Sequence, residues 1–517
     1  MRCARGAGAR RRACPRIARG DPRPRQARGC RCAHNTGRSL KTVVPARAGT
    51  HPSASEQADK WVPAFAGTTV WDCDWVDDPV ADRIVTHLTR IAAGEVPEAA
   101  HAAAKTFVAD TLGVGIAGVA APWRHAVLDM AGISGGAAEA TVWGSGEKLP
   151  LAQAAMVNAY QIHSQEFDCV HEGAVVHPMA AILPCLLGWA EREGGVSGEG
   201  LIRAIIAGVD VAVNLGLSSR APMRFFRPAN CGGFGATAAL ALFAGLDETQ
   251  TRDALGIYYG QCAGTMQAHV EASPQLAMQM GFAARAAVTA IELARRGMPG
   301  PRAPISGQFG YFALFDGAAD PAPFDELGRI WRISELSHKP WPSGRATHGG
   351  LDGLQRLIAA HGITPDQVAA GRFLVPALTY RLVGRPPDEE MTVAYARLCL
   401  PYVGAVCLRR GAVGLGDFSP EALGDPDTLA LARRLWVIAD DNPDLNALHP
   451  VRVELDLADG RTLACNVAEV LGSPARPLSL DAARAKFTAC SAPAALWDAG
   501  MSLETLGDAA ALARAAA

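Results

Sequence analysis

Hydrophobic residues recur at helical spacing over most of the chain after residue 80. Ile84, Leu88 and Ile91 lie three or four residues apart, and Pro97 opens a second amphipathic stretch. Four further helices are expected to begin near Leu201, Phe234, Thr249 and Gln275. Up to about residue 336 the pattern therefore predicts a mainly α-helical domain.

The pattern changes after residue 336. A helix expected from Gly349 to about His361 is followed by two short runs typical of strands, residues 373–383 and 451–457. Asp459 and Gly460 predict a turn, and residues 461–470 the returning strand of a hairpin. From Ser479 the helical spacing resumes and continues to the end. An α+β segment is thus flanked on both sides by helical residues.

Residues 1–78 differ from the rest. The first fifty contain one acidic residue, Asp21, against many arginines, and five of the thirteen cysteines precede position 74. Such a start is typical of a transit peptide or a nucleic-acid-binding arm. However, residues 43–50 and 61–68 share a Val-Pro-Ala-x-Ala-Gly-Thr pattern that resembles translated intergenic repeat DNA of bacteria. We therefore expect a disordered extension without function, with the true product starting near Val76 or Val80.

Composition and charge narrow the classes of partner. The chain has 517 residues, 49% of them hydrophobic, and its 49 basic and 51 acidic residues leave a formal charge of −2. This balance gives no general attraction to nucleic acid, and the apolar run 231–246 is shorter than the ~20 residues that span a bilayer. The cysteines of the globular part form no CxxC pair, which favours reduced, buried thiols. We expect a cytoplasmic protein that binds small molecules, not nucleic acid or membranes.

Proton-transfer groups are concentrated between residues 158 and 191. Pro178 fits the first position of a buried helix, because its missing N–H has no partner there. His177 then lies at the helix N-terminus, where the partial positive charge disfavours the imidazolium. A neutral imidazole is the form that a general base needs. The alternative is that His177 is only a polar cap over a core helix.

A metal site is a second interpretation of the same stretch. If the segment is helical, His163, Phe167 and His171 share one face, with Glu166 beside them. The set of His163, Glu166, Asp168 and His171 could in principle bind a divalent cation, although Asp168 is expected to be turned away from that face. Their spacing matches no named metal motif, so we expect no metal and no other cofactor.

The stretch resembles the signature of the MmgE/PrpD family. The matching positions are Asn158-Ala159, His163, Glu166-Phe167-Asp168-Cys169-Val170, His177-Pro178-Met179 and Ala190-Glu191. Flanking matches lie at residues 110–113, 117–118, 142–144, 297–301, 339, 342, 348, 400–402, 459–461, 472–474 and 486–487. The resemblance covers about residues 80 to 517.

The resemblance implies a fold and a chemistry. It implies a mainly α protein with a helical domain over residues 79–336 and 478–517, into which residues 337–477 are inserted as an α+β lid domain. Small-molecule sites prefer the cleft between such domains. Family members dehydrate 2-methylcitrate-like acids, decarboxylate cis-aconitate or epimerise iminodisuccinate, without metal or organic cofactor. A homodimer is also implied.

The family's functional positions carry over only in part. They make His177 the general base and Lys339 a carboxylate or enolate anchor, with Glu166, Asp168 and His163 positioning or relaying protons. The candidates for substrate binding are Arg227, His171, His348, Arg345 and His269. Four family positions are replaced here: threonine by Val170, histidine by Arg227, lysine by Leu276 and histidine by Gly344. Because leucine cannot mimic a carboxylate-binding cation, the charge pattern of the substrate is expected to differ.

The expected activity is that of a hydro-lyase, a dehydratase acting on a small polar di- or tricarboxylic acid. An epimerase or decarboxylase of the same acids is the alternative, since the same base and enolate stabilisation serve both. A third interpretation, favoured by the four replacements, is a family member that binds a carboxylate without turning it over. A metal-dependent hydrolase built on His163, Glu166, His171 and His177 comes last.

Overall fold

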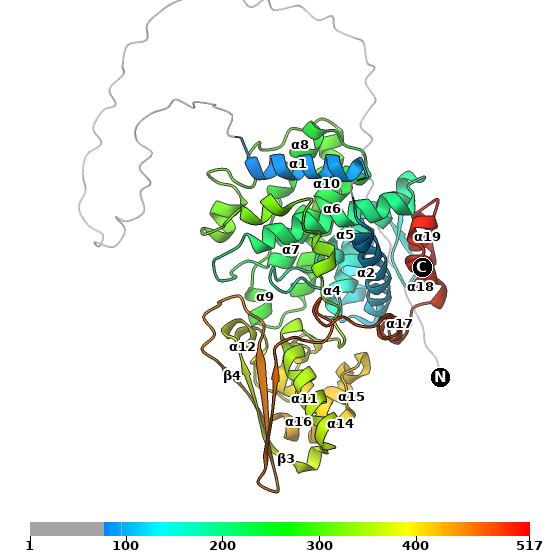
Figure 1. Ribbon diagram of the computed structural model, residues 1–517. Coiled ribbons are helices and arrows are strands. Elements are labelled where there is room, and N and C mark those ends of the chain that lie inside the picture. The colour runs from blue at the N-terminus through cyan, green and yellow to red at the C-terminus, as the bar shows by residue number, and fades with distance from the viewer. Residues whose placement is uncertain (1–76, 95) are drawn as a thin grey trace, which may run out of the picture. The chain divides into compact units, whose positions relative to one another are not determined.

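The computed structural model describes residues 77–94 and 96–517, most of them in helices (Figure 1). Strands are confined to one two-stranded and one four-stranded sheet within this part of the chain. The predicted mainly α fold class is therefore confirmed. Residues 1–76, expected from the sequence to be disordered, lie outside the described residues.

Long helices pack on one another to form the N-terminal body. They are α1 (Pro79–Ala92), α2 (Glu98–Ala117), α4 (Leu151–Ser164), α5 (Pro178–Glu193), α6 (Gly198–Leu217), α7 (Arg227–Phe243), α8 (Glu248–Tyr259) and α10 (Gln275–Arg295), with the shorter α3 (Arg124–Ile133) and α9 (Gln267–Val270). α5 and α7 contact each other, and each of them also contacts both α6 and α10. The body therefore has two central helices with others around them.

Small residues allow α6 and α7 to approach closely. A Cβ on Gly208 of α6 would lie 2.7 Å from the carbonyl oxygen of Gly235 on α7, so no larger residue fits there. Two helices, Glu98–Ala120 and Gly198–Leu217, are long and apolar enough to cross a membrane by composition. Neighbouring helices cover them, because 61% and 83% of their most apolar windows are buried. Apolar helices that are mostly buried in this way are typical of a protein core.

The four-stranded sheet lies in the C-terminal part of the chain, in the order β4 (Leu435–Ala439), β3 (Val368–Val375), β5 (Val451–Leu457), β6 (Thr462–Val467). β5 and β6 form the predicted antiparallel hairpin, while β3 and β4 are parallel. The accompanying helices are α11 (His348–His361), α12 (Ala377–Val383), α13 (Val393–Ala396), α14 (Leu400–Arg410), α15 (Pro420–Leu423) and α16 (Pro426–Ala432). α11 packs on β5 and β6, and α14 on β4.

Two strand predictions need correction. The expected strand over residues 373–383 ends at Val375, and α12 follows. Pro376 is the N-cap of α12, and proline cannot donate to a ladder, which explains why the strand stops there. β4 was not predicted, and neither was the short pair β1 (Ala140–Thr141) and β2 (Lys148–Leu149).

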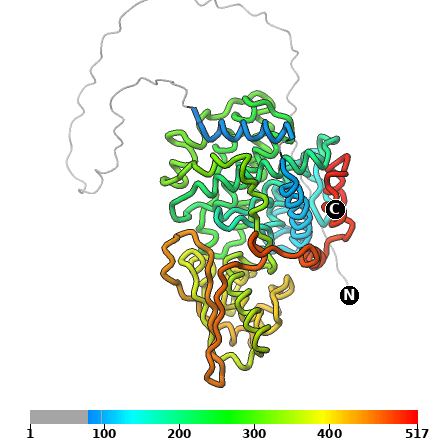
Figure 2. The backbone as a smooth tube through the Cα atoms, viewed as in Figure 1, coloured from blue at the N-terminus to red at the C-terminus, as the bar shows by residue number. Residues whose placement is uncertain are grey.

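The chain returns to the helical body at its C-terminal end. α17 (Leu480–Ala489) and α18 (Ala494–Met501) pack on α2, and α19 (Ala510–Ala515) packs on α5. Figure 2 shows this red segment beside the blue and cyan helices. The described residues belong to one compact unit, so the predicted domain boundaries after residues 336 and 477 stay predictions.

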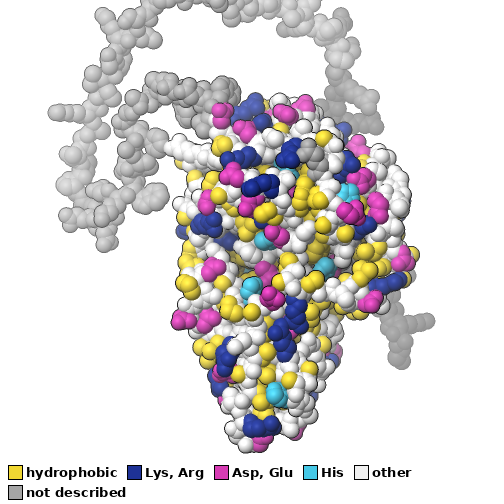
Figure 3. Space-filling view, in the orientation of Figure 1, with side chains coloured by type: hydrophobic (Ala, Val, Ile, Leu, Met, Phe, Trp, Pro, Cys, Tyr) yellow, Lys and Arg dark blue, Asp and Glu magenta, His cyan; other side chains and the backbone are white. Residues whose placement is uncertain are grey.

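The surface in Figure 3 mixes acidic and basic side chains over the visible face of the described residues. No large area of a single sign stands out on that face. The view agrees with the small formal charge of −2.

Asp78 belongs to the helical body, although its position was assigned to the N-terminal extension. Its Oδ1 accepts hydrogen bonds from the N–H groups of Val80 and Ala81, both at 3.1 Å, and so caps α1. Its Oδ2 accepts from the N–H groups of Ile305 at 2.7 Å and Ser306 at 3.0 Å. One carboxylate therefore joins the start of α1 to a loop more than 220 residues away.

We expect Asp78→Ala to lower the free energy of unfolding by about 1 to 3 kcal/mol, because it leaves buried N–H groups without acceptors. Urea unfolding measures the change. Asp77→Ala is the matched control, since Asp77 is exposed, and should stay within about 0.5 kcal/mol of the wild type. Equal stability of the two variants would contradict the capping role.

Candidate active site

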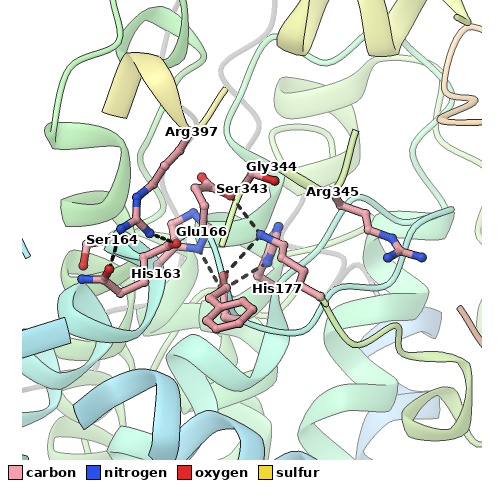
Figure 4. Close-up of polar contacts among 12 residues, drawn as sticks. His163, Ser164, Glu166, His177, Ser343, Gly344, Arg345 and Arg397 are labelled. Carbon is pink, nitrogen blue, oxygen red and sulfur yellow. Dashed lines mark hydrogen bonds and ion pairs between the residues drawn. The ribbon is translucent and has the colours of Figure 1, made fainter. Parts of the chain in front are cut away.

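The candidate site is built on the loop between α4 and α5 (Figure 4). α4 ends at Ser164, and Glu166 takes a left-handed conformation with a φ of 48°. The backbone of Val170 pairs with Ser337, which brings the segment that carries Lys339 against the loop. The loop is therefore not helical, and the expected helical face shared by His163, Phe167 and His171 does not exist.

α5 begins at the predicted residue. Pro178 occupies its first position and His177 is the N-cap residue. The helix is buried from Pro178 to Ala190, so the ring of His177 is held at the edge of the core. The predicted placement of His177 at a helix N-terminus is confirmed.

Asp168 joins the charged groups of the site. Its Oδ2 accepts a hydrogen bond from His163 Nδ1 at 2.9 Å. His177 Nδ1 lies 3.1 Å from the same oxygen but is too poorly aligned for a hydrogen bond. Lys339 Nζ lies 3.6 Å from Asp168 Oδ1 and donates to Glu166 Oε2 at 2.9 Å. The side chains of Asp168 and Lys339 are both fully buried.

Nearby positive charges keep both carboxylates ionised. Burial acts to raise the pKa of Glu166, but Lys339, His163 and His177 lower it to about 2. Burial likewise opposes ionisation of Asp168, yet His177, His163 and Lys339 hold its pKa well below the ordinary value. The two carboxylates are thus stabilised by the same three groups, Lys339, His163 and His177.

The two histidines are tuned in opposite directions. For His163, burial acts to lower the pKa, but the charge and hydrogen bond of Asp168 raise it overall. For His177, burial and the charge of Lys339 outweigh Asp168 and lower the pKa. The rings are 4.9 Å apart at 70°. Groups whose environments push their pKa values apart are typical of an acid and a base.

His163, Glu166 and His177 line a cavity of about 70 Å³, called here the inner cavity. Its other walls come mainly from apolar side chains of both halves of the chain. An adjoining outer cavity of about 130 Å³ shares four lining residues with it: His163, Glu166, Leu276 and Leu398. A small molecule in the inner cavity would therefore lie next to His177.

Two predicted substrate-binding residues also line the inner cavity. Burial and the charge of Arg385 lower the pKa of His269 to about 4. Arg345 points away from the cluster (Figure 4), and its guanidinium binds Glu172 Oε1 at 2.9 Å and the carbonyl oxygen of Leu471 at 2.8 Å. A substrate would meet Arg345 near its backbone rather than at its charge.

The other three predicted binding residues line neither cavity. Arg227 donates to the carbonyl oxygen of Ala221 at 3.0 Å. His171 Nε2 lies 3.2 Å from Glu335 Oε2, and His348 Nε2 lies 3.2 Å from the carbonyl oxygen of Ser343. Substrate contact by these three side chains finds no support in their positions.

Sequence reasoning missed Arg397, which lines the outer cavity. Its guanidinium donates to the carbonyl oxygen of Gln165 and, at 2.8 Å, to Gln165 Oε1, and so orders the residue before Glu166. Burial lowers its pKa to about 10. The only available signal was its place three residues before the family match at Leu400.

His163, Asp168 and His177 are the described residues that could hold a metal, since one ligand atom from each lies within 4.8 Å of the others. This set differs from the predicted one, because Glu166 is bound to Lys339 and His171 lies outside the cavity. A cation would have to part both Nδ1 atoms from Asp168 and tolerate the Lys339 ammonium 3.6 Å from its other oxygen. This electrostatic competition disfavours a metal.

We expect Lys339→Met to lower the free energy of unfolding by about 3 to 5 kcal/mol, because it leaves buried carboxylates without their cation. The double variant with Glu166→Gln should be destabilised by about 1 to 3 kcal/mol less than the sum of the two single effects. Urea unfolding of the four proteins in this cycle measures the coupling. Arg433→Met removes one partner of an exposed ion pair and is the control, expected to cost less than about 1 kcal/mol. Additive effects of the two buried substitutions would contradict the pairing.

Comparison with known proteins identifies the family. The MmgE/PrpD N-terminal domain matches residues 82–323 and the MmgE/PrpD C-terminal domain residues 341–497. Human cis-aconitate decarboxylase is 27% identical over 443 residues, which cover 82% of this chain and 90% of the relative. The mouse cis-aconitate decarboxylase is 28% identical over 405 residues (74% and 81%), and a cis-aconitate decarboxylase-like protein of Aspergillus oryzae 24% over 433 residues (79% and 89%). As its motifs predicted, this chain belongs to the MmgE/PrpD family.

Proposed function

We propose that the protein is an enzyme that acts on a small carboxylic acid as a cofactor-independent lyase of the dehydratase type. The observation that carries this proposal is the pair of oppositely tuned histidines on Asp168, beside the inner cavity. Family membership supports it, because the relatives described above are named for a reaction of a carboxylic acid. A cytoplasmic homodimer, as expected from the sequence, is part of the same proposal.

In the proposed reaction, neutral His177 removes a proton from the carbon next to a carboxylate. The electrons of that C–H bond pass into the carboxylate to form an enolate, which collapses to a C=C bond as the neighbouring C–O bond breaks. His163, which keeps its proton more readily, supplies it to the departing hydroxyl, so that water leaves. One proton then passes from His177 to Nε2 of His163, whose Nδ1 keeps the proton that it donates to Asp168 Oδ2, and the pair is reset.

Lys339 contributes positive charge where the enolate forms. Its Nζ is fully buried and donates to Glu166, so in this arrangement its effect on the cavity is electrostatic. The role predicted from the family is direct anchoring of a substrate carboxylate. For that role, Lys339 Nζ has to give up its hydrogen bond to Glu166 and donate to the substrate instead.

Decarboxylation is the second candidate, and the names of the three relatives favour it. In that reaction a C–C bond breaks, carbon dioxide leaves, and the resulting carbanion takes a proton from a histidine. Epimerisation uses the same base but returns the proton to the opposite face of the same carbon.

Product analysis tests the proposal. The purified protein would be incubated with a panel of di- and tricarboxylic hydroxy acids and with cis-aconitate, and the products read by NMR. Loss of water with a new C=C signal supports the dehydratase, while loss of carbon dioxide moves the decarboxylase to the front. Turnover that stops when a chelator is added would support the metal-dependent interpretation. Binding of an acid without turnover would support the non-catalytic interpretation.

We expect His177→Ala to lower kcat about 10²- to 10⁴-fold on the substrate found, because it removes the general base. Circular dichroism checks that the fold is kept. His361→Ala, at an exposed histidine, is the matched control and should leave kcat unchanged. Wild-type turnover by His177→Ala would overturn the role given to His177.

The pH profile gives an independent prediction. His177 must be neutral to act as base, and its pKa lies below the ordinary 6.5. Activity therefore falls only as the pH drops through this lowered pKa, so the acid limb of kcat/KM should lie below pH 6.5. Steady-state kinetics between pH 5 and 8 would locate it. An acid limb above pH 6.5 would contradict a neutral, buried base.

A further inference from the structure

Three of the four replaced family positions meet in one place. Val170, Leu276 and Gly344 all line the inner cavity, whereas Arg227 does not. The corresponding family residues are threonine, lysine and histidine, so each of the three changes removes a polar group. The lining of the inner cavity is thereby less polar at these three positions.

The geometry of residue 344 fits this change. A Cβ on Gly344 would lie 2.5 Å from Leu398 Cδ2, so a histidine could not enter unless Leu398 moved. Leu398 and Leu276 line both the inner and the outer cavity. The boundary between the cavities is therefore lined by these two leucines on the apolar side and by His163 and Glu166 on the polar side.

The outer cavity continues the apolar surface. Its lining includes Pro122, Trp123, Tyr160, Pro274, Ala277 and Val393. Trp123 is 59% exposed, which places this end of the cavity at the protein surface. An apolar group that leaves the inner cavity past Leu276 would thus find room to extend.

Three polar side chains that line the outer cavity form hydrogen bonds within the protein. Tyr160 Oη donates to the carbonyl oxygen of Pro122. Glu166 accepts from Lys339, and Arg397 donates to Gln165. The two basic side chains that line this cavity are partly engaged, because Arg397 binds Gln165 and His163 Nδ1 binds Asp168, although Arg397 Nε and His163 Nε2 have no partner.

We propose that the substrate is a carboxylic acid with an unbranched alkyl chain of several carbons. Its carboxylate and reacting carbon lie beside His177, and its chain runs past Leu276 into the outer cavity. This inference rests on the proposed function for the place of the reacting carbon. It differs from the expected small polar di- or tricarboxylic acid, because Leu276 stands where the family has a lysine.

The chain-length dependence of binding tests the inference without any need for turnover. Methyl-, propyl-, pentyl- and heptylsuccinate would be titrated by calorimetry. Each methylene should lower Kd about fourfold until the outer cavity is full. Propylsuccinate should also bind more tightly than tricarballylate, in which a third carboxylate replaces the chain. Affinity that is independent of chain length, or tighter binding of tricarballylate, would overturn the inference.

Leu276→Lys is the decisive variant. It should reverse the order, so that tricarballylate binds more tightly than propylsuccinate. Leu480→Lys adds the same charge at a 56% exposed leucine outside both cavities and should keep the wild-type order. Ala277→Phe, which fills the outer cavity, should end the gain in affinity at a shorter chain. If Leu276→Lys does not fold by circular dichroism, Ala277→Phe and the wild-type series decide the question.

Turnover of 3-alkylmalates with the same chains separates this inference from the proposed function. Loss of water that becomes faster with chain length supports both. Tight, chain-dependent binding of alkylsuccinates without turnover of any acid supports the alkyl pocket and overturns the lyase. Turnover of short polar acids alone, with longer chains rejected, keeps the lyase and overturns the alkyl pocket.

Discussion

The buried ammonium of Lys339 is the constraint on which the site depends. It is fully buried, and its partners Glu166 and Asp168 lie about 170 residues earlier in the chain. A buried charge is costly unless it is paired, so the loop and the segment around residue 339 have to stay together. The backbone pairing of Val170 with Ser337 sets that register. The ion pair with Glu166 is thus one of the links between the C-terminal half of the chain and the loop after α4, beside those of Arg345 with Glu172 and Arg397 with Gln165.

The division of roles between the histidines follows from this cluster. Both rings face Asp168 Oδ2, but only His163 makes a well-aligned hydrogen bond with it. Lys339 and burial then disfavour a second proton on His177. The same crowding that separates their pKa values leaves little room for a metal ion. The opposite pKa shifts of the two histidines are thus consequences of one arrangement of charges.

Family membership and the cavity walls carry different information. The family motif preserves the charged cluster, which accounts for proton transfer next to a carboxylate. Three of the four replaced positions line the inner cavity, beside the charged cluster. Leu276 and Leu398, at the passage between the cavities, are where this difference is concentrated.

The sequence alone determined features that depend on near neighbours. Helical spacing located α1 and α10, alternation located β5, and Pro178 placed His177 at a helix N-terminus. Tertiary structure decided what depends on distant partners. β4 forms because it pairs with β3, some 60 residues earlier, and the loop after α4 is extended because Val170 pairs with Ser337. The same is true of the contact of Arg397 with Gln165 and of the opposite pKa shifts of His163 and His177. It is also true of the boundary between the cavities at Leu276 and Leu398. In each case the groups involved meet only in the folded chain.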